Sequence, residues 1–381
     1  MRFLRLKLAA FATAALVTAC GGGGDGLHFS SFVNFGDSLS DVGTYRVGTV
    51  AAVGGGKWTI NSSAARNWTE SLAASAGVAA PCPAQTGMSP NIPGLVGGTI
   101  VNHPECTNYA QGSSRVSGIY APNSATLQPL GQFNLGFMAV PITVQMDTHL
   151  SKIGGHYQPN DLVTVLGGGN DAFMNINAVG AAAAGGAGAA GAAFTAGWPT
   201  SVQNAVAAGG AAAVNAAATQ AVTSMGAAGA ELAGLIKSKI LANGARYVVV
   251  VNLPDVSQSA FALTQDAQTR GLINTMVTTF NSQLAAGLSG SGVLLVDAYT
   301  QGRLQTASPA QFGLTNVTTP ACSTTSPNNP LQGASLTCTP NSLIPGDTSG
   351  YLFADSVHPT PLGYELIANH VRTQMHLAGW L

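Results

Sequence analysis

Charged side chains are scarce in this sequence, which has 14 Lys and Arg and 15 Asp and Glu among 381 residues. They make up 8% of the chain, whereas typical globular proteins carry about a quarter. The net charge of −1 provides no attraction to a polyanion, so we expect no nucleic-acid partner. A chain poor in charge but rich in small polar residues is more common among exported proteins.

Motifs for metal and phosphate chemistry are also missing. The sequence has no HExxH, no CxxC spacing and no carboxylate cluster beside its scattered histidines. The glycines at 167–169 are not followed by the GK[ST] of a phosphate-binding loop. We therefore expect no metal site and no cofactor.

Beyond the N-terminus, no apolar run is long enough to cross a membrane without interruption. Residues 1–20 have basic residues, a short apolar run and small residues before Cys20, which predicts a signal peptide that ends like a bacterial lipobox. Cys20 would then be lipidated, with residues 21–28 as a glycine-rich tether. The alternative is a plain secretory signal that ends near a cysteine. We expect a protein secreted or held at the outer membrane of the cell envelope, touching membrane only through that lipid.

Four further cysteines remain, and an even number in an exported chain predicts two disulfides. Four cysteines allow three pairings. We predict the local pairing, Cys82–Cys106 and Cys322–Cys338, because it closes two loops of modest length.

Apolar segments alternate with helical patterns over residues 29–381. Segments that are apolar on both faces are typical of parallel strands covered by helices on both sides. The pattern predicts an α/β fold, a three-layer α/β/α sandwich around a central, mostly parallel five-stranded sheet. The strand candidates are "FSSFVNF", "TIVNHPECTNYAQG", "DLVTVL", "ARYVVVVN" and "SGVLLVD".

Residues 178–230 interrupt this pattern, because they are nearly all Ala and Gly. Ala favours a helix and Gly opposes it. The segment is either an insertion of helices that frames the site or a low-complexity linker.

Polar residues that can carry chemistry follow the predicted strands, where open α/β sheets bind their ligands. Ser38 follows the first strand, Gly112 the second and Asn170 the third. Near the C-terminus, Asp355 and His358 are three residues apart. A histidine can take the proton of a serine hydroxyl when a carboxylate orients its other ring nitrogen. Taken singly, Asp355 suits a turn and His358 a surface position.

Four segments resemble, in order, the sequence blocks of the SGNH/GDSL esterase–lipase superfamily. They are "FGDSLSD", "NYAQGSS", "GGGND" and "DSVHPT". The resemblance covers residues 29–381 and implies the flavodoxin-like sandwich of SGNH hydrolases.

The resemblance also implies roles for single residues. Ser38 is the nucleophile, His358 the general base and acid, and Asp355 the residue that orients His358. The oxyanion hole comprises the backbone N–H groups of Ser38 and Gly112 and the side-chain amide of Asn170. The chain departs from the family pattern after Gly112, where the usual second small residue is a serine. Asp37 is expected to stabilise the turn.

These roles predict hydrolysis of carboxylic esters through an acyl-enzyme by a monomer, with a small-molecule, lipid or acylated-polymer ester as substrate. Acyl transfer to another alcohol uses the same intermediate and stays open. A surface lipoprotein that only binds ligands is the competing interpretation.

Overall fold

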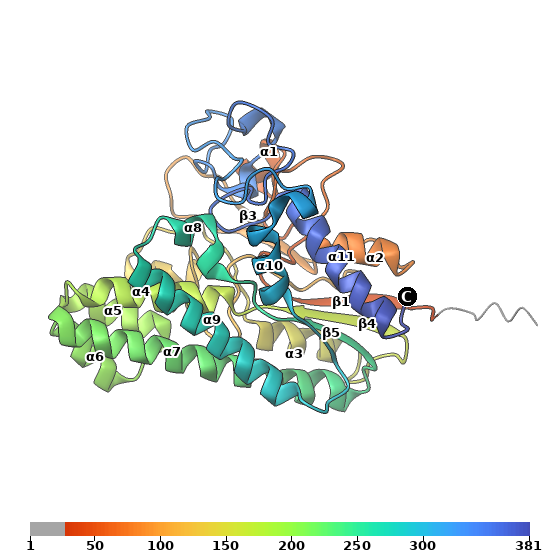
Figure 1. The fold of residues 1–381 in the computed structure, drawn as a ribbon, viewed down its shortest axis with the longest axis horizontal. Helices are drawn as coiled ribbons and strands as arrows, with labels where there is room; N and C mark the ends of the chain where they lie inside the picture. Colours follow the sequence, from red (N-terminus) through yellow and green to blue (C-terminus); the bar gives the residue numbers. More distant parts are fainter. Residues whose placement is uncertain (1–26) are drawn as a thin grey trace, which may run out of the picture.

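The computed structural model describes residues 27–381, so the predicted signal peptide, Cys20 and most of the glycine tether lie outside the described residues. A parallel sheet forms the centre of the molecule (Figure 1). Its strands have the order β1 (Ser31–Gly36), β4 (Asp161–Leu166), β5 (Tyr247–Val251) and β6 (Leu294–Val296). The β-branched and aromatic residues of these strands are buried on both faces, as a sheet covered on both sides requires.

The predicted sheet had five strands, whereas the central sheet of the described residues has four. The second candidate segment divides instead. Its first part, β3 (Gly98–Asn102), pairs antiparallel with β2 (Gln85–Met88) in a separate ribbon. Its later part lies beside β1 through one parallel bridge, between Asn34 and Asn108, and through three backbone hydrogen bonds that join residues 107–111 to β1.

That bridge nevertheless occupies the place of the missing strand. With it, the chain order across the sheet is second, first, third, fourth, fifth, which is the flavodoxin-like order. The α/β sandwich is therefore confirmed, with one strand reduced to a bridge.

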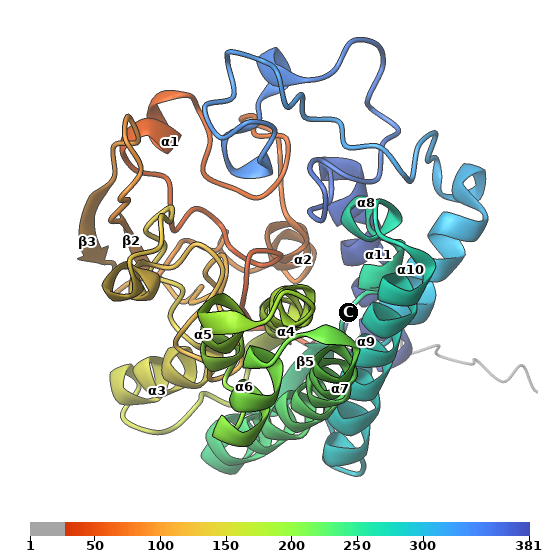
Figure 2. The same cartoon turned by 90° about the vertical axis from the view of Figure 1, so that its left-hand side faces the viewer.

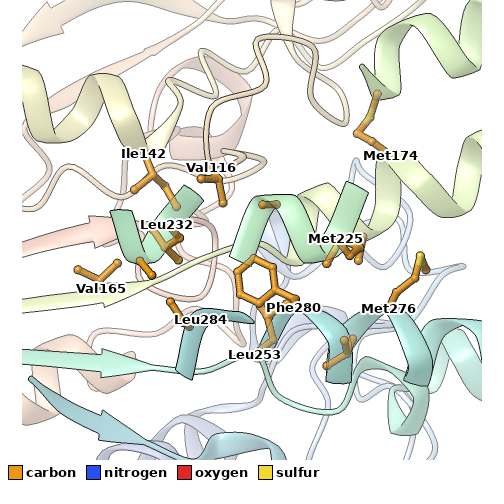
Figure 3. Close-up of a cluster of buried hydrophobic side chains, with 14 of the residues drawn as sticks. Val116, Ile142, Val165, Met174, Met225, Leu232, Leu253, Met276, Phe280 and Leu284 are labelled. Atoms are coloured by element: carbon orange, nitrogen blue, oxygen red, sulfur yellow. The ribbon is translucent and has the colours of Figure 1, made fainter. Parts of the chain in front are cut away.

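Helices cover both faces of the sheet (Figure 1). One face packs against α3 (Ile142–Lys152), α7 (Gly210–Leu235) and α9 (Ala267–Leu288). The other packs against α2 (Trp68–Ser75) and α11 (Pro361–Leu377). Figure 3 shows the first of these cores, to which α7 contributes Leu232 and α9 contributes Phe280.

The Ala/Gly-rich segment forms regular helices rather than an extended linker. It runs from the end of α4 (Gly169–Ala182) through α5 (Gly186–Ala196) and α6 (Thr200–Ala207) into α7. Its small side chains allow close packing: a Cβ at Gly229 would lie 2.3 Å from the carbonyl oxygen of Phe280 in α9. Figure 2 shows α4–α7 grouped together, with the β2–β3 ribbon to one side.

The remaining elements are short. Helices α1 (Gly48–Ala52), α8 (Ala260–Leu263) and α10 (Ala298–Ala307) accompany several single turns. These turns are 3₁₀ at Ala125–Leu130, Leu241–Asn243, Val256–Gln258, Pro309–Phe312, Ser335–Thr337 and Pro340–Ser342, and π at Ile236–Ile240.

Both predicted disulfides are present. Cys82–Cys106 closes the segment that carries β2 and β3, and Cys322–Cys338 closes part of the long loop between α10 and α11. None of the helices within residues 27–381 combines the length and the apolar character that crossing a bilayer requires.

Candidate active site

Ser38, His358 and Asp355 meet at one end of the sheet. Ser38 stands two residues after the end of β1, and the other two stand in the loop before α11. The Oγ atom of Ser38 lies 2.9 Å from Nε2 of His358. Nδ1 of His358 lies 2.8 Å from Oδ2 and 2.9 Å from Oδ1 of Asp355. The chain of hydrogen bonds from hydroxyl to carboxylate is therefore complete.

The Asp355 carboxylate is held by backbone groups as well. Its Oδ1 accepts the N–H of Val357 at 3.0 Å and that of His358 at 2.8 Å, which closes the tight turn. Its Oδ2 accepts the N–H of Ser335 at 2.9 Å. Burial alone would raise the pKa of Asp355, but the charge and hydrogen bond of His358, together with the backbone donors, hold it well below its usual range. Asp355 is therefore ionised at neutral pH.

Ser335 belongs to the long loop that Cys322–Cys338 closes. The second disulfide therefore lies in the segment that positions the carboxylate beside His358. No local pattern in the sequence links Ser335 with Asp355, so this contact was not foreseen.

Trp58 forms one wall beside His358. Its ring centroid lies 4.7 Å from that of the imidazole, and Trp58 also packs against Phe137 and Tyr45. The structure shows that it both packs in a core cluster and lines the groove.

Asp41, the last residue of "NFGDSLSD", organises the neighbouring backbone. Its Oδ1 accepts the N–H groups of Gly43 and Thr44 at 2.9 and 2.8 Å. Its Oδ2 accepts the N–H of Gly112 at 3.0 Å and lies 3.4 Å from Nε1 of Trp58. Sequence reasoning missed this residue, because its partners come from three separate segments.

The contact with Asp41 changes the interpretation of Gly112. Its N–H already has an acceptor, so the structure does not place this amide free to receive a substrate oxygen. Packing also requires glycine at this position. A Cβ at Gly112 would lie 2.2 Å from the ring of Trp58, so glycine is needed for the close approach of the indole.

Ser113, one residue later, lines the groove in an unusual conformation. Its φ of 70° lies in the left-handed region, which glycine adopts far more readily than serine. The departure of the sequence from a second small residue therefore falls at a strained position on the wall of the site.

Asn170 lies at the start of α4, directly after the glycines that end β4. Gly168 adopts a φ of 111°, which turns the chain sharply from the strand into the helix. The side chain of Asn170 donates one hydrogen bond to the carbonyl of Ser114 at 3.0 Å. The adjacent Asp171 forms a buried ion pair with Arg115 at 2.8 Å. These two contacts fix the asparagine and glycine blocks against each other.

Asp37 is buried directly beside the nucleophile. Its Oδ1 accepts the N–H of Leu39 at 3.1 Å, a local bond that stabilises the turn after β1. Burial raises the pKa of Asp37 to about 7, against the opposing effects of that N–H and of His358.

A groove with a volume of about 460 Å³ runs along the carboxyl ends of the strands and includes Ser38, Asn170 and His358. None of residues 178–230 lines it. Its lining is predominantly apolar, with Leu39, Trp58, Leu135, Phe137, Phe173, Leu253 and Phe261 among the larger side chains. Within the described residues, no three His, Cys, Asp or Glu side chains gather in a way that could hold a metal ion.

Comparison with known proteins places this geometry in a family. The family model described as "GDSL-like Lipase/Acylhydrolase" matches residues 32–371. The chain belongs to this family. A GDSL esterase/lipase of Arabidopsis thaliana is 29% identical over 121 residues, and the match spans 32% of each chain, about a third of that relative's length.

Among solved structures, an extracellular lipase from Streptomyces rimosus is 15% identical and has a TM-score of 0.38, with coverage of 89% of this chain and 99% of that one. The description of the fold rests on the strand order of the chain itself.

Proposed function

We propose that the protein hydrolyses carboxylic esters through an acyl-enzyme formed on Ser38. The observation that carries this proposal is the unbroken series of hydrogen bonds from Ser38 through His358 to Asp355. Its position at the edge of an apolar groove and the family membership support it.

In the first half-reaction, Oγ of Ser38 attacks the ester carbonyl while Nε2 of His358 takes its proton. Ionised Asp355 accepts the Nδ1–H bond and stabilises the imidazolium. The tetrahedral intermediate collapses, the bond to the alcohol oxygen breaks, and His358 returns the proton to that oxygen. Water then attacks the acyl-serine with the same general base, and the acid leaves.

The oxyanion of the intermediate needs preorganised donors. We assign the backbone N–H of Ser38 and the side-chain amide of Asn170, as the family resemblance implied. For the third donor we assign the backbone N–H of Ser113 instead of that of Gly112. Ser113 lines the groove, whereas the Gly112 amide is bound to Asp41.

The apolar lining favours an ester with a substantial hydrocarbon part over a small, fully polar one. The proposed substrate class is therefore an aliphatic or lipid-like ester.

The test combines labelling with turnover. A fluorophosphonate probe should label the folded protein at Ser38, and p-nitrophenyl esters should be hydrolysed. Ser38→Ala should abolish labelling and lower kcat on the order of 10⁴-fold or more. Ser201→Ala, at an exposed position in α6, is the matched control and should retain both.

Three outcomes bear on the alternatives. A folded protein without label or turnover would support a binding role and sink the proposal, as would a nearly active Ser38→Ala. Product partition in the presence of added alcohol separates hydrolysis from acyl transfer, and a dominant transfer product would overturn the hydrolytic assignment.

A further inference from the structure

The two ends of the groove differ in chemistry. Near His358 the walls are largely apolar and aromatic, with Trp58, Leu135 and Phe137. The other end lies beside β6, between α10 and α11, which are neighbours in both views of the fold (Figures 1 and 2). There the ends of β5 and β6 supply an apolar floor with Val251 and Val296.

Helix α10 presents one face to this end of the groove. Its lining residues recur at the spacing of a single helical face, yet they are small or polar instead of apolar. They are Ala298, Gln301, Gly302, Gln305 and Thr306.

Gln305 is the most informative of these residues. It is 5% exposed, and its side-chain amide makes no hydrogen bond to any other residue in the described part of the chain. The amide has no protein partner there, and where it faces the groove it is open to water or to a ligand group. Its place in the groove wall gives it access to a ligand.

Helix α11 contributes a second polar group of the same kind. His370 lines the groove, and its Nε2 is buried with no hydrogen-bond partner within residues 27–381. Burial also lowers the pKa of this histidine, against the opposing effect of the Asp297 backbone and charge, and so favours the neutral ring. The unpartnered Nε2 is then available to a ligand group. Two unrelated elements thus bring unpaired polar groups to the same end of an apolar groove.

We propose that Gln305 and His370 form a polar subsite for a hydrogen-bonding group at the far end of the ester. The proposal rests on the proposed function, because it takes Ser38 as the point of attack. Ser38 follows β1 and the subsite lies beside β6, three strand spacings away, or roughly 14 Å. The substrate class is therefore an ester whose hydrocarbon chain carries a hydroxyl or a second carbonyl at about that distance from the reacting carbon.

The experiment compares chain-matched esters that differ only in a terminal hydroxyl. One series holds the p-nitrophenyl leaving group constant and pairs plain with ω-hydroxy acyl chains from hexanoyl to dodecanoyl. The other holds the acetyl group constant and pairs straight-chain alcohols with the matching diol monoacetates, followed by acetate release. At the chain length that reaches the subsite, the hydroxylated ester should have a kcat/KM about three- to tenfold higher, in the acyl series or the alcohol series according to which part of the ester enters.

Gln305→Leu roughly keeps the size of the side chain but removes its amide, and it should bring this ratio to about one. His370→Leu should act in the same direction. The matched control is Gln311→Leu, which changes an exposed glutamine shortly after α10 that does not line the groove and should leave the ratio unchanged.

Gly302→Leu tests whether the hydrocarbon chain of the ester enters this end of the groove. A Cβ at Gly302 would meet nothing within 4 Å, so a side chain extends into open space without disturbing the helix. Turnover of long-chain esters should fall about tenfold relative to acetate. Ratios near one in both series, or a ratio that survives Gln305→Leu, would overturn the subsite. Absence of any turnover and of Ser38 labelling would instead refute the proposed function.

Discussion

Asp41 is a buried carboxylate that shapes the site, although it is not part of the hydrogen-bonded series Ser38–His358–Asp355. It holds the N–H groups of Gly43, Thr44 and Gly112, and so joins the turn after Ser38 to the segment that carries Ser113. Ser113, which directly follows Gly112, lines the groove.

We expect Asp41→Asn to cost about 2–3 kcal/mol of unfolding free energy, since an amide NH₂ would face at least one backbone donor. It should also lower kcat for p-nitrophenyl acetate about ten- to a hundredfold by displacing Ser113 and Trp58. Urea unfolding and steady-state kinetics measure both effects. Asp347→Asn, at an exposed turn carboxylate, is the control and should change stability by less than about 0.5 kcal/mol. Unaltered kinetics in folded Asp41→Asn would contradict this account.

Asp37 predicts a dependence of stability on pH. Its folded pKa of about 7 exceeds the ordinary value of 3.8, so the folded state binds the proton more tightly than the unfolded state. The stabilisation is full below pH 3.8 and is lost as the pH rises toward about 7. Between pH 5 and 8 the loss amounts to about 3 kcal/mol, from roughly two pH units at about 1.4 kcal/mol each.

Asp37→Asn should remove this slope. The measurement is urea unfolding of both proteins at several pH values, and the difference between them isolates Asp37 from other titrating groups such as His149. An equal slope in the two proteins would show that Asp37 is ionised in the fold throughout.

At the scale of single residues, the sequence predicts the contacts between residues that lie within one short motif. The Asp-x-x-His spacing is local, and the structure places Asp355 and His358 in hydrogen-bond contact as that spacing suggested. The contacts of Asp41 with Gly112 and Trp58 join residues that are far apart along the chain, so no local pattern reveals them.

Helix α7 illustrates what can be predicted for an element. Composition left the segment open between helices and a linker, because Ala and Gly have opposite helix propensities. Packing decides the matter: Gly229 sits where α9 approaches most closely, and alanines at 213, 217 and 221 are buried along one face.

Two glycines of this helix make a matched pair. Gly229→Ala should destabilise the protein by about 1–3 kcal/mol, because its Cβ would overlap the carbonyl of Phe280. Gly234→Ala, where a Cβ meets nothing, should stabilise it by up to about 1 kcal/mol. Thermal unfolding of both variants measures the two changes in stability. The same sign for both would show that propensity and not the α7–α9 contact governs this helix.

The predicted strand at residues 99–112 shows what the sequence could not predict about an element. Apolar character placed a strand near residues 99–112, but pairing depends on the partner. The pairing with β1 is confined to residues 107–111, just after the disulfide at Cys106, and Asn108 also bridges to Pro83 on its other side. Neither constraint is visible in hydrophobic periodicity.

For the whole molecule, alternation of apolar and helical segments was enough to predict the layers of the sandwich, because each layer follows from which faces must be buried. The long loop between α10 and α11 was not predictable beyond its disulfide. Its contribution, the N–H of Ser335 on Asp355, depends on the tertiary path of the loop.

The two disulfides should therefore differ in their effects. Cys322→Ser/Cys338→Ser should lower stability by about 3 kcal/mol and also reduce kcat, because the loop that holds Asp355 is released. Cys82→Ser/Cys106→Ser should lower stability comparably with a smaller change in kcat, since no residue between these cysteines contacts Asp355. Melting curves and kinetics below the melting transition measure both. Equal losses of kcat would argue against a role for the loop in positioning the carboxylate.

The hydrogen bond between Ser38 and His358 joins residues 320 positions apart. During synthesis at about 5–20 residues per second, the serine is made roughly 16–64 s before the histidine. Throughout that interval the nascent chain carries a nucleophile without its base. If the proposed mechanism holds, Ser38 cannot attack an ester efficiently before His358 has been made, so the order of the two residues along the chain delays the activity during synthesis.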